Sequence, residues 1–255
     1  MPEKSILFKV RSPLSGEYLP VPHVDQAQMR EVDRIAVEDF GLGILQMMEN
    51  AGRNLAAVAL QSLGADRSGR VIVAAGSGGN GGGGMCAARH LHNRGVPVSV
   101  LLTRPPEELG GAAAVQCRIL QQAGVPVRRA DQRPETLQGA VLILDALIGY
   151  SLRGAPSGIS RALIEQVNAS GCPAIALDLP SGLDASSGVT PGVCVRAEQT
   201  VTLALPKPGL TNPVAGALIL ADIGIPPSVY QQLGVDAGNF WGREWRLPLR
   251  RIAED

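Results

Sequence analysis

The chain has 255 residues, which is enough for one large α/β domain or two small ones. Hydrophobic residues make up 45% of the chain and charged residues 18%, so it can build a sizeable core and is not a disordered protein. Lysine plus arginine and aspartate plus glutamate number 23 each, and this neutral balance gives no electrostatic case for a nucleic acid or anionic membrane partner.

The first elements expected along the chain are an extended segment and two helices. Residues 1–24 contain four prolines and no helical periodicity, so we expect an N-terminal extension that wraps the domain. Asp25 is a candidate N-cap, and the apolar spacing after it predicts a helix with one buried stripe. Gly41 and Gly43 interrupt this pattern, and a second helix is expected to end near Gly64.

From Arg70 onward, strand and helix patterns alternate. Candidate strands are 71–75, 98–102, 141–145, 174–178, 199–205 and 217–222, and candidate helices are 84–94, 107–123 and 158–169. Strands such as VLIL and AIAL are nearly continuous apolar runs, which indicates burial on both faces and therefore a parallel sheet between two layers of helices. After residue 199 the strands are not separated by long helices, so we expect an antiparallel end of the sheet. Residues 25–255 contain no linker, and we interpret them as a single domain.

A glycine-rich segment follows the first of these strands. Residues 76–84 read GSGGNGGGG, and a helical pattern begins at Met85. Glycine lets backbone N–H groups approach a ligand closely, and a helix start favours an anion, so we interpret the segment as a phosphate- or dinucleotide-binding loop. A tight structural turn is the alternative. Strand 98–102 is followed by Thr103 and Arg104, not by the acidic residue of nicotinamide-dinucleotide dehydrogenases, so hydride transfer is disfavoured.

Two carboxylates are expected at the same edge of the sheet as this glycine segment. Asp145 and Asp178 each end an apolar strand, and ligands of parallel sheets bind beyond the carboxyl ends of the strands. Together with Asn80 and Ser181, Asp145 offers only oxygen ligands, which suits a hard cation rather than zinc. A second glycine-bounded loop, residues 149–158, is either a phosphate-gripping loop or an ordinary connection.

Taken in chain order, these segments resemble the NAD(P)H-hydrate epimerase family, which is built on the YjeF N-terminal domain. The resemblance covers about residues 25–230 and is carried by the paired opening helices, the glycine segment, and the sequences DALIGYSLRG, DLPSGLD, LPKPG and ADIGIP. It implies a Rossmann-like three-layer α/β/α sandwich with a central, mostly parallel sheet and two N-terminal helices. It also implies an isomerase for cofactor repair, which epimerises hydrated NADH and NADPH at C6 of the nicotinamide ring.

The resemblance implies the site residues as well. A potassium ion would be held by Asn80, Asp145 and Ser181. The hydrated cofactor would contact residues of the two loops and the end of one strand, namely Gly79, Asn80, Gly81, Gly82, Gly83, Gly149, Tyr150, Ser151, Leu152, Arg153, Gly154, Ala155 and Asp178. We hypothesise that Asp178 is the catalytic acid and base, because a carboxyl group at the ring edge can protonate a leaving hydroxyl and deprotonate incoming water.

The glycine segment departs from the family pattern at two positions. The family reads GNNGGDG, and this chain has Gly79 and Gly83 in place of the first Asn and the Asp. Each replacement removes side-chain hydrogen bonds to the ligand, each worth about 1–3 kcal/mol, and leaves the backbone cradle. A non-catalytic nucleotide-binding or dimerisation scaffold of the same fold is therefore the alternative function.

The resemblance also suggests partners and a location. Members are commonly homodimers that act on a small-molecule substrate, here hydrated NADH or NADPH. Since few residues follow the ADIGIP segment, we expect either a separate hydrate dehydratase that takes up the repaired epimer or a chain that is an excised half of a two-domain enzyme. No apolar run approaches the roughly 18 residues of a membrane span. The four widely spaced cysteines form no CxxC pair and suit a reducing cytoplasm.

Overall fold

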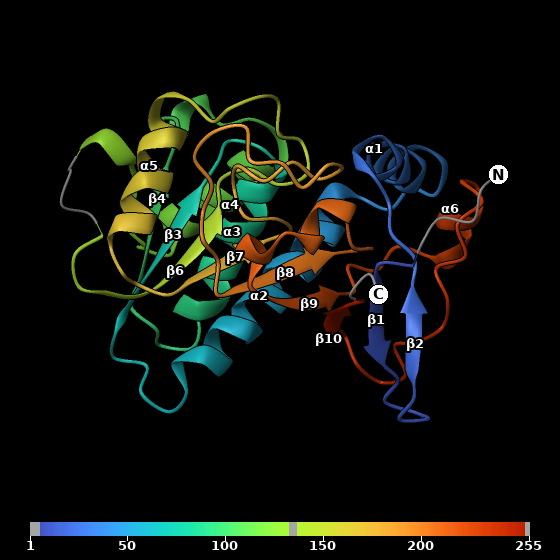
Figure 1. Ribbon diagram of the computed structural model, residues 1–255. Helices are drawn as coiled ribbons and strands as arrows, with labels where there is room; N and C mark the ends of the chain where they lie inside the picture. The colour runs from blue at the N-terminus through green and yellow to red at the C-terminus, as the bar shows by residue number, and fades with distance from the viewer. Residues whose placement is uncertain (1–5, 133–136, 253–255) are drawn as a thin grey trace.

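A single twisted sheet runs through the computed structural model, which describes residues 6–132 and 137–252 (Figure 1). Ten strands of the described chain form it, in the order β2-β1-β10-β9-β8-β7-β6-β3-β4-β5. Their bounds are β1 Phe8–Arg11, β2 Tyr18–Val21, β3 Arg70–Ala75, β4 Val98–Leu102, β5 Val127–Arg129, β6 Ala140–Ala146, β7 Ala174–Leu177, β8 Gln199–Leu203, β9 Ala217–Ala221 and β10 Arg246–Arg251.

Seven neighbouring strands pair in parallel, in the sheet order β9-β8-β7-β6-β3-β4-β5. The other three, β2, β1 and β10, pair antiparallel. The antiparallel end that we expected after residue 199 begins later, because β8 and β9 pair in parallel. The connection between them contains two short 3-10 turns, Pro208–Thr211 and Pro213–Ala215, in place of a helix. A parallel crossover needs a sufficient length of chain, and a helix is only its usual form.

The three antiparallel strands were not expected from the sequence. Part of the N-terminal segment, which we expected to be an extended arm, forms the β1–β2 hairpin, and β10 joins this hairpin to β9. β10 reads RLPLRR, with Leu247 and Leu249 buried and the positions between them facing outward. This alternation is typical of a sheet that is covered on one face only.

Helices cover both faces of the parallel region, which confirms the three-layer arrangement. Three helices share a hydrophobic cluster on one face, α2 Ile44–Leu63, α3 Gly79–His92 and α4 Gly111–Gln122, and α5 Gly158–Ala169 packs on the other. Neighbouring residues of β3 divide between the faces, since Val73 belongs to the first cluster and Ile72 to the second. Two more helices, α1 Gln26–Arg34 and α6 Pro227–Gln231, lie near the antiparallel end (Figure 1). Among the described residues, no helix combines the length and apolarity that crossing a bilayer requires.

The glycine-rich segment is mostly helical, which corrects the expectation of a loop up to residue 84. Helix α3 begins at Gly79, and its N-cap is Gly78. A Cβ atom on Gly81 would lie 1.8 Å from the carbonyl oxygen of Gly76, and one on Gly84 would lie 2.4 Å from Cβ of Ala146. These glycines therefore let α3 pack directly on the strand ends. Only the N–H groups of its first turn lack helical partners and are available to a ligand.

Candidate functional site

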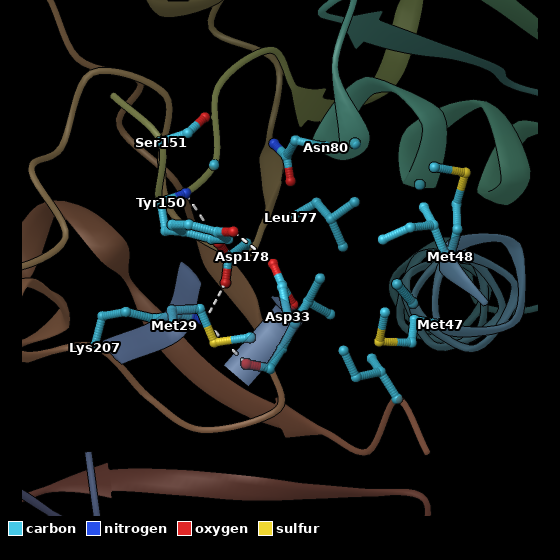
Figure 2. Close-up of a pocket in the computed structure, with 17 residues that line it drawn as sticks. Met29, Asp33, Met47, Met48, Asn80, Tyr150, Ser151, Leu177, Asp178 and Lys207 are labelled. Atoms are coloured by element: carbon cyan, nitrogen blue, oxygen red, sulfur yellow. Dashed lines mark hydrogen bonds and ion pairs between the residues drawn. The ribbon is translucent and has the colours of Figure 1, made fainter. Parts of the chain in front are cut away.

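A pocket of about 200 Å³ lies beyond the carboxyl ends of β7 and β8, at the edge where the sequence predicts a ligand site (Figure 2). Its walls come from α1, α2, the first turns of α3, the loop after β6, and the segments that follow β7, β8 and β9. The residues that line it are Met29, Asp33, Ile44, Met47, Met48, Ala51, Gly79, Asn80, Gly83, Gly149, Tyr150, Ser151, Leu177, Asp178, Leu203, Lys207 and Ile223. Most of these are apolar, so the few polar groups determine its chemistry.

Asp178 and Lys207 form a buried ion pair in this pocket. The Lys207 ammonium nitrogen lies 2.5 Å from Oδ1 of Asp178 and also donates to the carbonyl oxygen of Leu203 at 2.9 Å. The backbone N–H of Tyr150 donates to Oδ2 of Asp178 at 3.0 Å. Lys207 has no exposed surface and Asp178 is only 3% exposed, and buried charges are tolerated only when they are paired. Each of the two charges therefore depends on the other.

The backbone of Asp178 is strained. Its φ angle is +68°, in the left-handed region that residues with a Cβ rarely adopt and that costs about 1–2 kcal/mol. A hydrogen bond from its N–H to the carbonyl of Val201, at 2.7 Å, holds this conformation at the end of β7. Such strain is typical of sites where a side chain must be aimed in one direction.

A second acidic group faces the same pocket from α1. The phenol of Tyr150 donates to Oδ2 of Asp33 at 2.5 Å (Figure 2). Burial raises the pKa of the Asp33 carboxyl, and the hydrogen bond from Tyr150 offsets part of this rise. Burial and the nearby Asp33 charge raise the pKa of the Tyr150 phenol, which therefore keeps its proton and remains a donor. The Gln26 side chain donates to the Tyr150 carbonyl at 2.6 Å and so ties this loop to α1.

Asp145 lies beneath the pocket, completely buried at the end of β6. Its carboxylate accepts hydrogen bonds from the hydroxyl and the backbone N–H of Ser181, at 2.5 and 2.8 Å, and from the N–H of Leu147 at 3.2 Å. Burial raises its pKa to about 6, and in the described part of the chain no cationic side chain contributes to the opposite effect. The carboxylate therefore carries a charge without a counter-ion.

The loop that follows β6 lies between Asn80 and the Asp145–Ser181 pair and connects them indirectly. The N–H of Ile148 donates to the Ser181 hydroxyl oxygen at 2.8 Å, and the next residue, Gly149, lies against Asn80. A Cβ atom on Gly149 would lie 3.1 Å from both Oδ1 of Asn80 and Oδ2 of Asp178, so glycine permits this close approach. The amide nitrogen of Asn80 is buried and makes no hydrogen bond to the described residues.

Each of these three side chains carries an oxygen atom, and one is a buried carboxylate that no cationic side chain of the described residues offsets. The unpartnered Asn80 atom is the amide nitrogen, which is a donor and does not ligate a cation. Hard cations such as the alkali and alkaline-earth ions prefer oxygen donors of this kind.

The structure brings together about half of the residues for which we expected substrate contacts. Seven of them line the pocket: Gly79, Asn80, Gly83, Gly149, Tyr150, Ser151 and Asp178. Gly81 and Gly82 are buried where α3 packs on the rest of the protein. Four more belong to the same loop as Tyr150 but lie outside the lining, namely Leu152, Arg153, Gly154 and Ala155. Their contacts with a ligand stay a prediction.

Sequence reasoning did not single out two polar residues of the pocket. Lys207 was noted only as part of LPKPG, and no local signal marks it as buried, because lysine is almost never buried unless it is paired. Asp33 lies four residues after Met29, so it falls on the buried face of α1. A carboxylate on the buried face of an amphipathic helix was the signal for it.

Comparisons with known proteins agree with the resemblance. The family model described as YjeF-related protein N-terminus matches residues 44–209. An NAD(P)H-hydrate epimerase from Dehalogenimonas lykanthroporepellens is 52% identical over 209 residues, which cover 81% of this chain and 84% of that protein. A bifunctional NAD(P)H-hydrate repair enzyme Nnr from Moorella thermoacetica is 37% identical over 80% of this chain, which spans only 40% of that enzyme.

A solved structure supports the fold. The crystal structure of yeast YNL200c superimposes with a TM-score of 0.77 and covers 89% of this chain and 100% of its own. At 22% sequence identity, this likeness establishes the fold alone.

Proposed function

This chain belongs to the family of YjeF-related N-terminal domains, and on that premise we propose that it is an NAD(P)H-hydrate epimerase. Such an isomerase interconverts the two epimers of hydrated NADH or NADPH at C6 of the nicotinamide ring. The observation that carries the proposal is the Asp178 carboxylate, which Lys207 and the Tyr150 N–H hold inside a mostly apolar pocket at the carboxyl ends of parallel strands.

The reaction needs an acid and a base beside C6. The hydrated carbon carries a hydroxyl next to the ring nitrogen, so protonating that hydroxyl lets it leave as water. The nitrogen lone pair stabilises the resulting cation, and a water molecule then returns to either face and loses a proton. Asp178 is the group that we assign to these proton transfers, and general acid–base catalysis of this kind typically contributes about 10²–10⁴-fold.

The pocket fits one part of the dinucleotide. Its volume of about 200 Å³ is below the roughly 300–1,000 Å³ of sites for drug-sized ligands, so it accommodates the nicotinamide ring and leaves the rest of the molecule outside. Met47 and Met48 offer apolar contacts to the ring. The unpaired N–H groups in the first turn of α3, at Gly79 to Gly81, are placed to bind a phosphate of the cofactor.

We further propose that Asn80, Asp145 and Ser181 bind a potassium ion. Their oxygen donors and the uncompensated Asp145 charge support this assignment. When bound, the ion would supply a positive charge that neutralises Asp145 and stabilises the loop after β6. The side chains of the pocket would carry out the proton transfers.

The two glycines that depart from the family pattern have different surroundings. A Cβ on Gly79 would meet nothing within 4 Å, whereas one on Gly83 would lie 2.7 Å from Cδ2 of Leu177. In this chain Leu177 therefore fills the space next to residue 83, and the ligand is held there by apolar contact. The glycine at residue 83 favours the second candidate function. This function is a scaffold of the same fold that binds nucleotide without catalysis.

Two partners follow from the same premise. We propose that the protein is a homodimer and that a hydrate dehydratase uses its product. The name of the bifunctional Moorella thermoacetica relative supports a link between repair activities.

One assay tests the proposed function. A single purified epimer of hydrated NADH is incubated with the protein in KCl or NaCl, and both epimers are followed by chromatography against a protein-free control. We expect interconversion that Asp178→Asn abolishes and that Asp184→Asn retains, since Asp184 lies in the same segment but outside the pocket lining. Binding of the epimer without interconversion by the unaltered protein would instead select the scaffold function.

A further inference from the structure

The pocket holds an acidic pair that the proposed mechanism does not use. Asp33 and Tyr150 both line the cavity, and their side chains are joined by the 2.5 Å hydrogen bond from the phenol to Oδ2. Asp33 enters from α1 and Asp178 from the end of β7, so two different elements bring the carboxylates to Tyr150 (Figure 2). A partly buried carboxyl group without an ion pair is costly to desolvate, which points to a role for Asp33 in the pocket.

The two carboxylates hold opposite ends of the same residue. The backbone N–H of Tyr150 donates to Asp178, and its phenol donates to Asp33. They also have different electrostatic surroundings. Asp178 is ion-paired with Lys207, whereas Asp33 has no ion pair among the described residues, and burial raises its pKa. The charged groups that act on the Asp33–Tyr150 pair are Lys207 and Asp178 of the same pocket and Arg30 on α1.

Epimerisation makes a demand that one carboxylate meets poorly. The nicotinamide ring is flat at the cationic stage, and inversion requires the hydroxyl to leave from one face and water to return to the other. A side chain on one side of the ring reaches only that face with the alignment that proton transfer needs. Two acid–base groups whose surroundings favour different protonation states are a common solution to such a task.

We propose that Asp33, held in place by Tyr150, is a second acid–base group of this pocket and serves the ring face that Asp178 does not. This proposal rests on the proposed epimerase function. In one direction Asp33, as the carboxylic acid, gives its proton to the C6 hydroxyl. The C–O bond then breaks with both electrons leaving on oxygen, and the ring nitrogen shares its lone pair with C6.

Water then completes the inversion. Its oxygen forms the new bond to C6 on the opposite face, and its extra proton passes to the Asp178 carboxylate. One proton has left Asp33 and one has arrived at Asp178, and exchange with solvent restores both groups. In the reverse direction the two residues exchange roles.

Oxygen exchange in ¹⁸O-labelled water separates the two faces. Each pure epimer is incubated with the protein, and mass spectrometry after chromatography measures label in the starting epimer and in its inverted product. For Asp33→Asn, we expect one epimer to keep exchanging its oxygen with retention while its inversion falls at least tenfold. The other epimer should lose both reactions. Asp178→Asn should give the mirror image, with the epimers interchanged.

The variants are chosen so that folding does not obscure the result. Asparagine at residue 33 still accepts the hydrogen bond from Tyr150, and Tyr150→Phe, which keeps the ring, should change the exchange-to-inversion ratio in the same direction. Glu31→Gln is the matched control, because Glu31 lies on the same helix, is half exposed and bonds to Arg34. This control should behave as the unaltered protein.

Two results would overturn the proposal, and they are distinguishable. If Asp33→Asn keeps the exchange-to-inversion ratio of the unaltered protein for both epimers, or if both Asp variants impair the same epimer, then one group serves both faces. If the unaltered protein neither exchanges nor inverts either epimer, the epimerase function itself fails, and this inference fails with it.

Discussion

Replacing Lys207 by methionine is the sharpest test of how the pocket is held together. Methionine keeps most of the unbranched stem and removes the ammonium group, which has no exposed surface and lies 2.5 Å from Asp178. Asp178 would retain the N–H of Tyr150 as a donor, and the carbonyl of Leu203 would lose the hydrogen bond from Lys207. Breaking one side of a buried ion pair typically costs about 3–5 kcal/mol, and we expect a loss of that size.

Urea unfolding at pH 8 measures this loss. Lys207→Met, Asp178→Asn and the double variant form a cycle, and the double variant should be more stable than the sum of the single losses predicts, by about 2 kcal/mol or more. The reasoning would be refuted if the two single losses simply add, or if Lys207→Met costs less than about 1 kcal/mol at pH 8.

Four further predictions concern the cation, the glycines and the second acid. Potassium chloride should stabilise the folded protein more than sodium chloride at equal ionic strength, by about 1.4 kcal/mol when potassium is in tenfold excess over its Kd. A higher melting temperature in potassium would show this difference, and Asp145→Asn should remove it. Gly81→Ala should lower the free energy of unfolding in urea by about 3 kcal/mol or more, because its Cβ would lie 1.8 Å from a backbone oxygen. A Cβ at Gly78 would meet nothing within 4 Å, so Gly78→Ala should change this free energy by less than about 1 kcal/mol. Gly79→Asn has open space and should lower KM for the hydrated cofactor by up to about tenfold without loss of stability, as steady-state kinetics and urea unfolding would measure. Folding raises the pKa of Asp33, so its negative charge destabilises the folded state at pH values above the pKa that this group has in the unfolded chain. Asp33→Asn should therefore raise the free energy of unfolding, measured in urea at pH 7, and this gain should disappear below about pH 4.

Much of the parallel core could be predicted from the sequence. Strand β4 and helix α5 have the bounds that the apolar patterns indicated, and the strands that precede Asp145 and Asp178 end within one residue of the expected positions. These elements are read correctly because burial on both faces leaves a continuous apolar run, which is a local property. The short edge strands lack such a run, and their pairing depends on distant segments.

The glycine segment shows where local preference and tertiary structure disagree. Glycine disfavours helix by about 1 kcal/mol per residue relative to alanine, so the run at 79–84 suggested a loop. The folded chain makes it helical because Gly81 and Gly84 allow α3 to touch the strand ends. The gain from close packing outweighs the local preference, and no window of sequence contains the partners that provide it.

By itself, the sequence determined the layers of this protein, the edge of the sheet at which the pocket lies, and the carboxylates at that edge, because buried strands and their ends leave a local pattern. Only the tertiary structure decided which charges meet. Lys207 pairs with Asp178 across 29 positions of the chain, and Tyr150 reaches Asp33 across 117. Such pairs depend on the three-dimensional path of the backbone, since a buried charge needs its partner within a few ångströms and has no preference for where in the chain that partner lies.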